Sequence, residues 1–154
     1  MTTHQHGTHG STSWGDAASA TLHCLTGCAI GEVAGMVIGS AAGLDIGAVV
    51  LLSVVLAFVT GYALTVRSVR AAGLALGAAL GVAFAADTVS ILVMEVVDNA
   101  TIVLVPGAMT AGLGTVLFWV SLAGSLALAF VLTVPVNRWL MGRGRGHAVV
   151  HALH

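Results

Sequence analysis

Residues 46–66 read IGAVVLLSVVLAFVTGYALTV and contain no charged side chain. A helix needs about 20 mostly apolar residues to cross the hydrocarbon core of a bilayer, so this stretch predicts a transmembrane helix. Three stretches of similar length and apolar character accompany it, at residues 18–43, 71–97 and 110–134. No ten-residue segments alternate between apolar and polar residues, as the strands of a membrane barrel would. The sequence therefore predicts an all-α fold, an integral membrane bundle of four transmembrane helices.

The composition excludes two large classes of protein. Of 154 residues, 58% are hydrophobic and 7% are charged, against about 25% charged residues in an ordinary soluble domain. So few charges cannot cover the surface of a water-soluble monomer. The chain has five Arg and no Lys, so it also lacks the basic patch on which nucleic-acid binding depends.

The arginines predict how the chain is oriented. Arg67 and Arg70 separate the second and third stretches, and the remaining arginines follow the fourth, within a tail at residues 135–154. Positively charged residues are enriched on the cytoplasmic side of membrane proteins. We therefore expect both termini in the cytoplasm, with Pro135 ending the fourth helix. The polar segment 1–17 has no basic region at its start, so we do not expect it to be a cleaved signal peptide.

Glycine recurs at every fourth position in two of the expected helices. The first contains Gly27, Gly31, Gly35 and Gly39, and the third contains Gly73, Gly77 and Gly81. Small residues at this spacing allow helix backbones to approach closely in lipid. We expect these two helices to contact each other, within one subunit or between two, and the chain to form a homo-oligomer or to join a larger membrane complex.

A second series with the same spacing carries metal-binding side chains. Cys24, Cys28, Glu32 and Met36 form a slowly curving line on the first helix, and His23 precedes them. Thiol and thioether donors favour Cu(I), with Zn(II) or Hg(II) as weaker alternatives. We do not expect a disulfide between the two cysteines, because both Cβ atoms point along the same helix face.

The third helix adds acidic residues on the face that also carries its glycines. These are Asp87, Glu95 and Asp98, with Met94 beside them. We expect Asp87 at the depth of Met36, and Asp98 near the outer end of its helix. No Lys or Arg lies at a comparable depth in the sequence, so Glu32, Asp87 and Glu95 are candidates for charge balance or proton coupling. Together, the two helices predict a ladder of moderate sites for a cation.

Six of the seven histidines lie in the two tails, where they could capture a metal. They are His4, His6, His9, His147, His151 and His154. Since His23 is the only histidine within an expected helix, one subunit cannot supply two axial ligands, and we do not expect heme.

Four segments resemble a known family. They are HCLTGCAIGEVAGMVIG (23–39), ADTVSILVME (86–95), VPGAM (105–109) and PVNRWLMGRGRGHAVVHALH (135–154). They are similar to small four-span bacterial membrane proteins described only as a domain of unknown function, with an HCxxGCxxGE first helix. The resemblance extends over residues 20–151 and implies a multi-pass protein of the bacterial inner (plasma) membrane, sometimes joined to or near copper-protein sequences. It implies no activity or substrate.

Several functions are compatible with these patterns. The first is binding or transport of a soft metal, Cu(I) above all. The alternatives are an accessory or structural subunit of a larger membrane complex, a proton-coupled carrier or channel for a small solute, and a membrane redox enzyme. No Ser-His-Asp grouping, phosphate loop or HExxH motif indicates hydrolysis, so we do not expect an enzyme of that kind.

Overall fold

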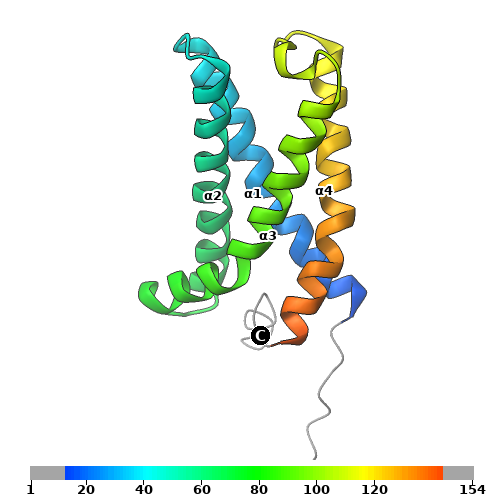
Figure 1. Cartoon of the computed structure of the whole chain (residues 1–154). Helices are drawn as coiled ribbons and strands as arrows, with labels where there is room; N and C mark the ends of the chain where they lie inside the picture. The colour runs from blue at the N-terminus through cyan, green and yellow to red at the C-terminus, as the bar shows by residue number, and fades with distance from the viewer. Residues whose placement is uncertain (1–12, 144–154) are drawn as a thin grey trace, which may run out of the picture.

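The computed structural model describes residues 13–143, which form four long helices in an antiparallel bundle (Figure 1). The helices are α1 (Trp14–Ala41), α2 (Ile46–Ala71), α3 (Leu76–Leu104) and α4 (Val116–Gly142), with a short 3-10 helix, η1 (Ala108–Thr110), between the last two. The described part of the chain contains no strand. All four helices are long and apolar enough to span a membrane. This confirms the expected all-α, four-helix, multi-pass architecture.

Polar caps and a glycine turn fix the boundaries of the first two helices. The Ser13 hydroxyl accepts a hydrogen bond from the Asp16 N–H at 3.0 Å, and the Asp16 carboxylate accepts one from the Ser13 N–H. Asp45 caps α2 by accepting a hydrogen bond from the Ala48 N–H at 3.1 Å. Between these helices Gly43 has φ +67°, a conformation that costs glycine little. Short turns of this kind hold neighbouring helices antiparallel.

The last two helices extend further than expected. The third runs to Leu104 instead of ending at residue 97, because Pro106 is the first helix breaker in that region. The fourth continues through Pro135 to Gly142. Proline removes only one backbone donor, and transmembrane helices tolerate it where neighbouring groups satisfy the backbone. Our expectation that Pro135 ends the helix is therefore wrong.

The other helix limits also differ from the expected ones. The first helix already begins at Trp14, four residues ahead of the expected span, because Ser13 supplies its cap. The second runs on to Ala71 and so includes both Arg67 and Arg70. The fourth begins at Val116, after η1, because Thr115 is its capping residue.

The glycines of α1 pack against α2. A Cβ on Gly27 would lie 2.7 Å from the Cα of Gly61, and one on Gly31 would overlap the backbone of Ala57. Gly35 meets Ser53 and Gly39 meets Val49 in the same way, so each step of four along α1 matches a step of four back along α2. The close contact of α1 is thus with α2. Our expectation that the glycines of α1 pack against the third helix is wrong. The missed signal was the equal spacing of the small residues Ser53, Ala57 and Gly61.

The second glycine series makes no close contact within the described residues. Gly73 lies in the turn before α3 with φ +96°, so it belongs to no helix face. A Cβ on Gly77 or Gly81 would meet nothing within 4 Å. This part of α3 is exposed on the surface of the bundle.

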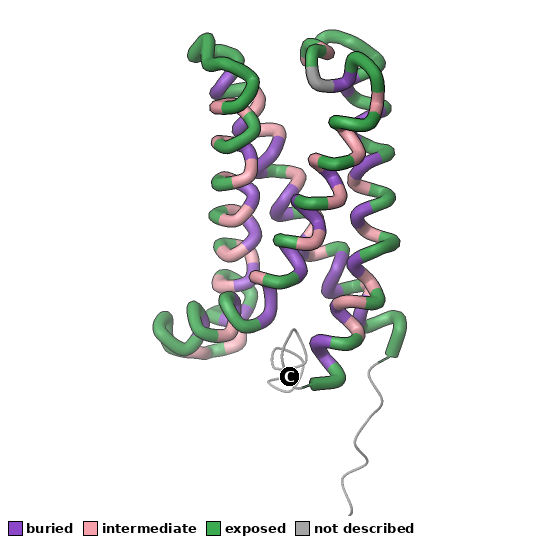
Figure 2. The backbone as a smooth tube through the Cα atoms, viewed as in Figure 1, coloured by how far each residue is buried: buried purple, intermediate pink, exposed green. Residues whose placement is uncertain are grey.

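Buried residues line the interior of the bundle, and exposed residues lie on its outer surface (Figure 2). Large aliphatic side chains cover its surface, for example Val96 at 67% and Val120 at 63% exposure. The buried polar side chains are Thr21, Glu32, Ser53, Thr65, Asp87, Ser90, Glu95, Asp98, Ser121, Ser125, Thr133 and Asn137. Lipid requires an apolar surface, and polar groups in membrane bundles are held in the interior. Contact with the bilayer follows from this distribution.

All four described arginines lie at one end of the bundle, which we call the arginine end (Figure 1). Arg67 and Arg70 lie in the last turns of α2, and Arg138 and Arg143 at the end of α4. Arg138 lies 4.3 Å above the ring of Trp14. We call the opposite end, formed by the α1–α2 turn and the α3–α4 connection, the cavity end.

Candidate functional site: a cavity floored by carboxylates

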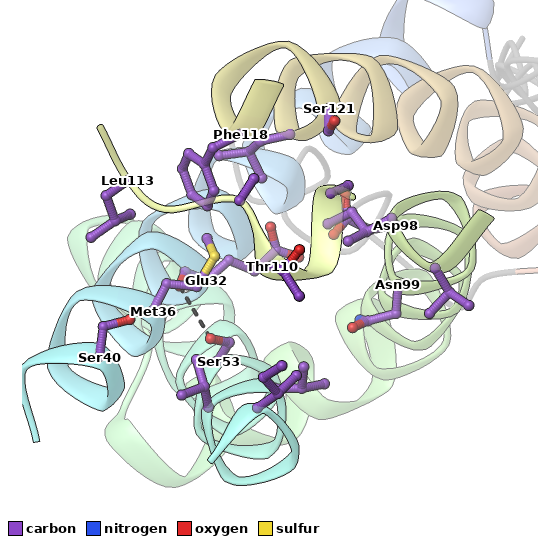
Figure 3. A pocket seen from close by; sticks show the side chains of 18 of the residues that line it. Glu32, Met36, Ser40, Ser53, Asp98, Asn99, Thr110, Leu113, Phe118 and Ser121 are labelled. Atoms are coloured by element: carbon purple, nitrogen blue, oxygen red, sulfur yellow. Dashed lines mark hydrogen bonds between the residues drawn. The ribbon is translucent and has the colours of Figure 1, made fainter. Parts of the chain in front are cut away.

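A cavity of about 610 Å³ opens between the four helices at the cavity end (Figure 3). All four helices and η1 contribute to its lining. In Figure 3, Glu32 and Met36 reach it from α1, Asp98 from α3, and Phe118 from α4. The α1–α2 hairpin and the α3–α4 hairpin separate at this end, and the cavity lies between them (Figure 1).

Three carboxylates from two helices form the floor of this cavity. Glu32 of α1 and Glu95 of α3 are each 5% exposed, and Asp98 of α3 is 3% exposed. Glu32 is close enough to interact with both of the others. We expected Asp98 near the end of its helix, but α3 continues for more than a turn beyond Asp98. The Asp98 side chain faces Ser125 of α4.

Four of the six side-chain oxygens in this group of carboxylates have no hydrogen-bond partner among the described residues. Neither side-chain oxygen of Glu95 has a hydrogen-bond partner among the described residues, nor has Oε2 of Glu32 or Oδ1 of Asp98. The cavity lining contains no Arg, Lys or His. A buried ionised group without a partner is very costly in a low-dielectric interior. The cluster therefore requires positive charge from protons or from a bound cation.

The two cysteines lie next to this floor, deeper in the bundle. Cys24 and Cys28 are 2% and 1% exposed, and both are free thiols, as expected. The two thiols interact with each other, and Cys28 also interacts with Glu95. Met94, at 1% exposure, belongs to the same buried cluster as the cysteines. Glu95 thus connects the carboxylates of the cavity floor to the sulfur atoms, which lie closer to the arginine end.

The structure separates the other members of the expected ladder. Met36 lines the cavity and lies about 12 Å along the α1 axis from Cys28. His23 is half-buried and lies about 100° around the helix from Cys24. Within residues 13–143, no three side chains of His, Cys, Asp and Glu are gathered closely enough to hold a metal ion. The reason is geometric, because residues four apart on one helix are about 6 Å apart along its axis.

Asp87 lies much closer to the arginine end than we expected. It interacts with Thr65 of α2, which is one step of four beyond Gly61 and therefore about a turn below Gly27. The expected alignment of Asp87 with Met36 is wrong, because α1 and α3 are offset so that Glu32 meets Glu95 and Asp98.

A buried hydrogen-bond network fills the interior between the cysteines and the arginine end. The Ser90 hydroxyl donates to the side-chain oxygen of Asn137, whose amide nitrogen donates to the Thr21 hydroxyl at 2.8 Å. Thr21 in turn donates to the Ala17 carbonyl at 2.7 Å. The network joins α1, α3 and α4. No periodic pattern in the sequence indicates this network, since each helix supplies a single side chain.

The tail histidines lie outside the described residues. These are His4, His6, His9, His147, His151 and His154. Their expected role in metal capture stays a prediction.

These features define a class: a multi-pass four-helix membrane bundle with polar side chains in its interior and an acidic cavity at one end. The chain belongs to the family described as "Domain of unknown function (DUF4396)", whose model matches residues 13–146. This agrees with the resemblance seen in the sequence to an uncharacterised family. No curated protein and no solved structure matches the chain.

Proposed function

We propose that this protein binds a soft metal cation, Cu(I) in the first place, and carries it across the membrane through the bundle interior. The observation that carries the proposal is the position of Glu95, which interacts with Glu32 on the cavity floor and with Cys28 below it. A cation leaving the cavity would pass from oxygen to sulfur donors without crossing a purely apolar layer. Successive moderate sites suit passage better than one tight cage.

Copper is the preferred metal because of the donors beneath the floor. Cys24, Cys28 and Met94 share one buried cluster, and two thiols with a thioether suit Cu(I) better than a hard cation. The carboxylates Glu32, Glu95 and Asp98 would balance the charge of the entering ion. Zn(II) and Hg(II) remain the alternatives, since both also bind thiolates.

The test is metal binding and uptake by the purified protein in liposomes under reducing conditions. We expect the wild type to retain Cu and to admit it into the liposomes. The double variant Cys24→Ser/Cys28→Ser should lose both properties, and Met94→Leu should weaken Cu binding at least about tenfold. Met141→Leu is the matched control, because Met141 is buried in a separate cluster at the arginine end. A wild-type protein that carries no Cu, Zn or Hg after supplementation would refute the proposal.

A second candidate is the accessory subunit of a membrane complex. It is favoured by the exposed face of α3, where Gly77 and Gly81 leave open space of the kind that a neighbouring helix fills. Such a subunit should co-purify with a partner or a second copy, and Gly81→Leu should abolish that association. Unchanged association in Gly81→Leu would exclude this face as the contact.

A further inference from the structure

The cavity is far larger than a bare metal ion needs. Its volume of about 610 Å³ is about twenty times the share of one water molecule in the liquid. It falls within the range of about 300–1,000 Å³ that is usual for sites of small organic molecules. The size of the cavity therefore indicates an organic ligand and not a bare ion.

The walls of the cavity are mostly apolar. Three of the helices contribute aliphatic or aromatic side chains, among them Val50 and Val54 of α2, Ile102 of α3, and Phe118 and Leu122 of α4. Phe118 and Leu122 are buried, at 8% and 5% exposure. Such walls give a hydrated ion little to bind, but they suit the apolar part of an organic molecule.

The floor supplies the opposite chemistry. Glu95 is 5% exposed, lines the cavity and has no hydrogen-bond partner on either oxygen among the described residues. Glu32 and Asp98 each add another oxygen without a partner. An unpartnered acidic floor at the base of an apolar cavity is complementary to a cationic donor on an apolar body, because a charged N–H group forms strong hydrogen bonds with carboxylates.

We propose that the cavity binds an organic cation, namely an ammonium group carried on an apolar body of up to drug size. The ammonium group contacts Glu32, Glu95 and Asp98, and the body packs against the apolar walls. This site lies between the sulfur cluster and the cavity end. It shares its carboxylates with the entrance of the proposed metal path, but it does not require the cysteines. The ammonium group can belong to a free amine or to an amine-headed lipid, since both present the same chemistry.

The experiment compares two probes of the same shape, 1-adamantylammonium and neutral 1-adamantanol. Their binding to the full chain is measured by calorimetry in nanodiscs of phosphatidylglycerol, which has no amine. We expect the ammonium probe to bind at least about tenfold more tightly than the alcohol. Equal affinities, or no binding of the ammonium probe, would overturn the proposal.

Variants separate the floor from the walls. Glu95→Gln should remove most of the preference for the ammonium probe, and the cavity-filling variant Ile102→Trp should weaken the binding of both probes. Helical content and thermal transition confirm that each variant is folded. A folded Glu95→Gln that keeps the full preference, or a folded Ile102→Trp that binds both probes normally, contradicts the site.

Two further measurements identify the source of the amine and distinguish failure of the amine site from failure of the proposed metal function. In nanodiscs containing phosphatidylethanolamine, competition with the probe identifies an amine-headed lipid as the ligand, and undiminished binding identifies a free amine. Cys24→Ser/Cys28→Ser should keep amine binding while losing Cu. Loss of amine binding in this folded variant would contradict an amine site that does not require the cysteines.

Discussion

Asn137 joins three helices with a single side chain. Its carbonyl oxygen accepts from Ser90 of α3, and its amide nitrogen donates to Thr21 of α1. Within a bilayer, side-chain hydrogen bonds between helices contribute about 0.6–2 kcal/mol each. The same residue lies below the cysteines, where its network fills the interior between the sulfur cluster and the arginine end.

We predict that Asn137→Ala lowers the free energy of unfolding by about 1–3 kcal/mol, because Ser90 and Thr21 lose their partner. The measurement is thermal unfolding of the purified protein in detergent. Thr133→Val is the control, one turn away on α4. The Thr133 hydroxyl is buried and has no hydrogen-bond partner among the described residues, so replacing it with a methyl group should not lower stability. A stable Asn137→Ala would show that the network contributes little.

At the scale of elements, the α1–α2 seam is the tightest contact in the bundle. Gly27, Gly31 and Gly35 let two backbones touch, and the Thr60 hydroxyl donates to the Gly27 carbonyl across the seam at 2.5 Å. Lipid provides no hydrophobic force between helices, so close packing of this kind is what holds them together. The seam also positions Glu32, which lies on α1 between Gly31 and Gly35 along the chain.

We predict that Gly31→Ala destabilises the bundle by about 1–3 kcal/mol, because its Cβ overlaps the Ala57 backbone and overpacking forces the helices apart. The matched control is Gly77→Ala on α3, where a Cβ meets nothing. Thermal unfolding of both variants gives the comparison. Equal transitions for Gly31→Ala and the wild type would mean that the seam is looser than described.

The whole molecule is polarised along its axis. The cavity opens at one end, and all described arginines lie at the other. If the arginine end faces the cytoplasm, as the positive-inside rule predicts, the cavity faces the opposite side of the membrane. The proposed metal and amine would then enter from outside the cytoplasm.

This orientation predicts the labelling of single cysteines placed in the Cys24→Ser/Cys28→Ser background. Leu44→Cys, in the α1–α2 turn, should react in intact cells with a membrane-impermeant thiol reagent. Ala72→Cys, in the α2–α3 turn, should react only after the cells are opened. The reverse pattern would invert the orientation and the proposed direction of entry.

How far the site could be predicted differs between its residues. The acids Glu32 and Glu95 and the cysteines are conspicuous in the sequence, because each interrupts an apolar helix. Their relative depth was not predictable, since it depends on the offset between α1 and α3. That offset brings Glu32 to Glu95 and Asp98 and leaves Asp87 near Thr65.

The class of this protein follows from its sequence alone, because scarce charge and four long apolar stretches permit little other than a membrane bundle of helices. Which helix faces meet depends on the three-dimensional packing. Glycine spacing indicates that a helix will pack closely, but the partner of α1 is chosen by the complementary small residues of α2 and by the short turn at Gly43. The cavity, too, exists only in three dimensions, because its apolar walls and its acidic floor come from helices far apart in the chain.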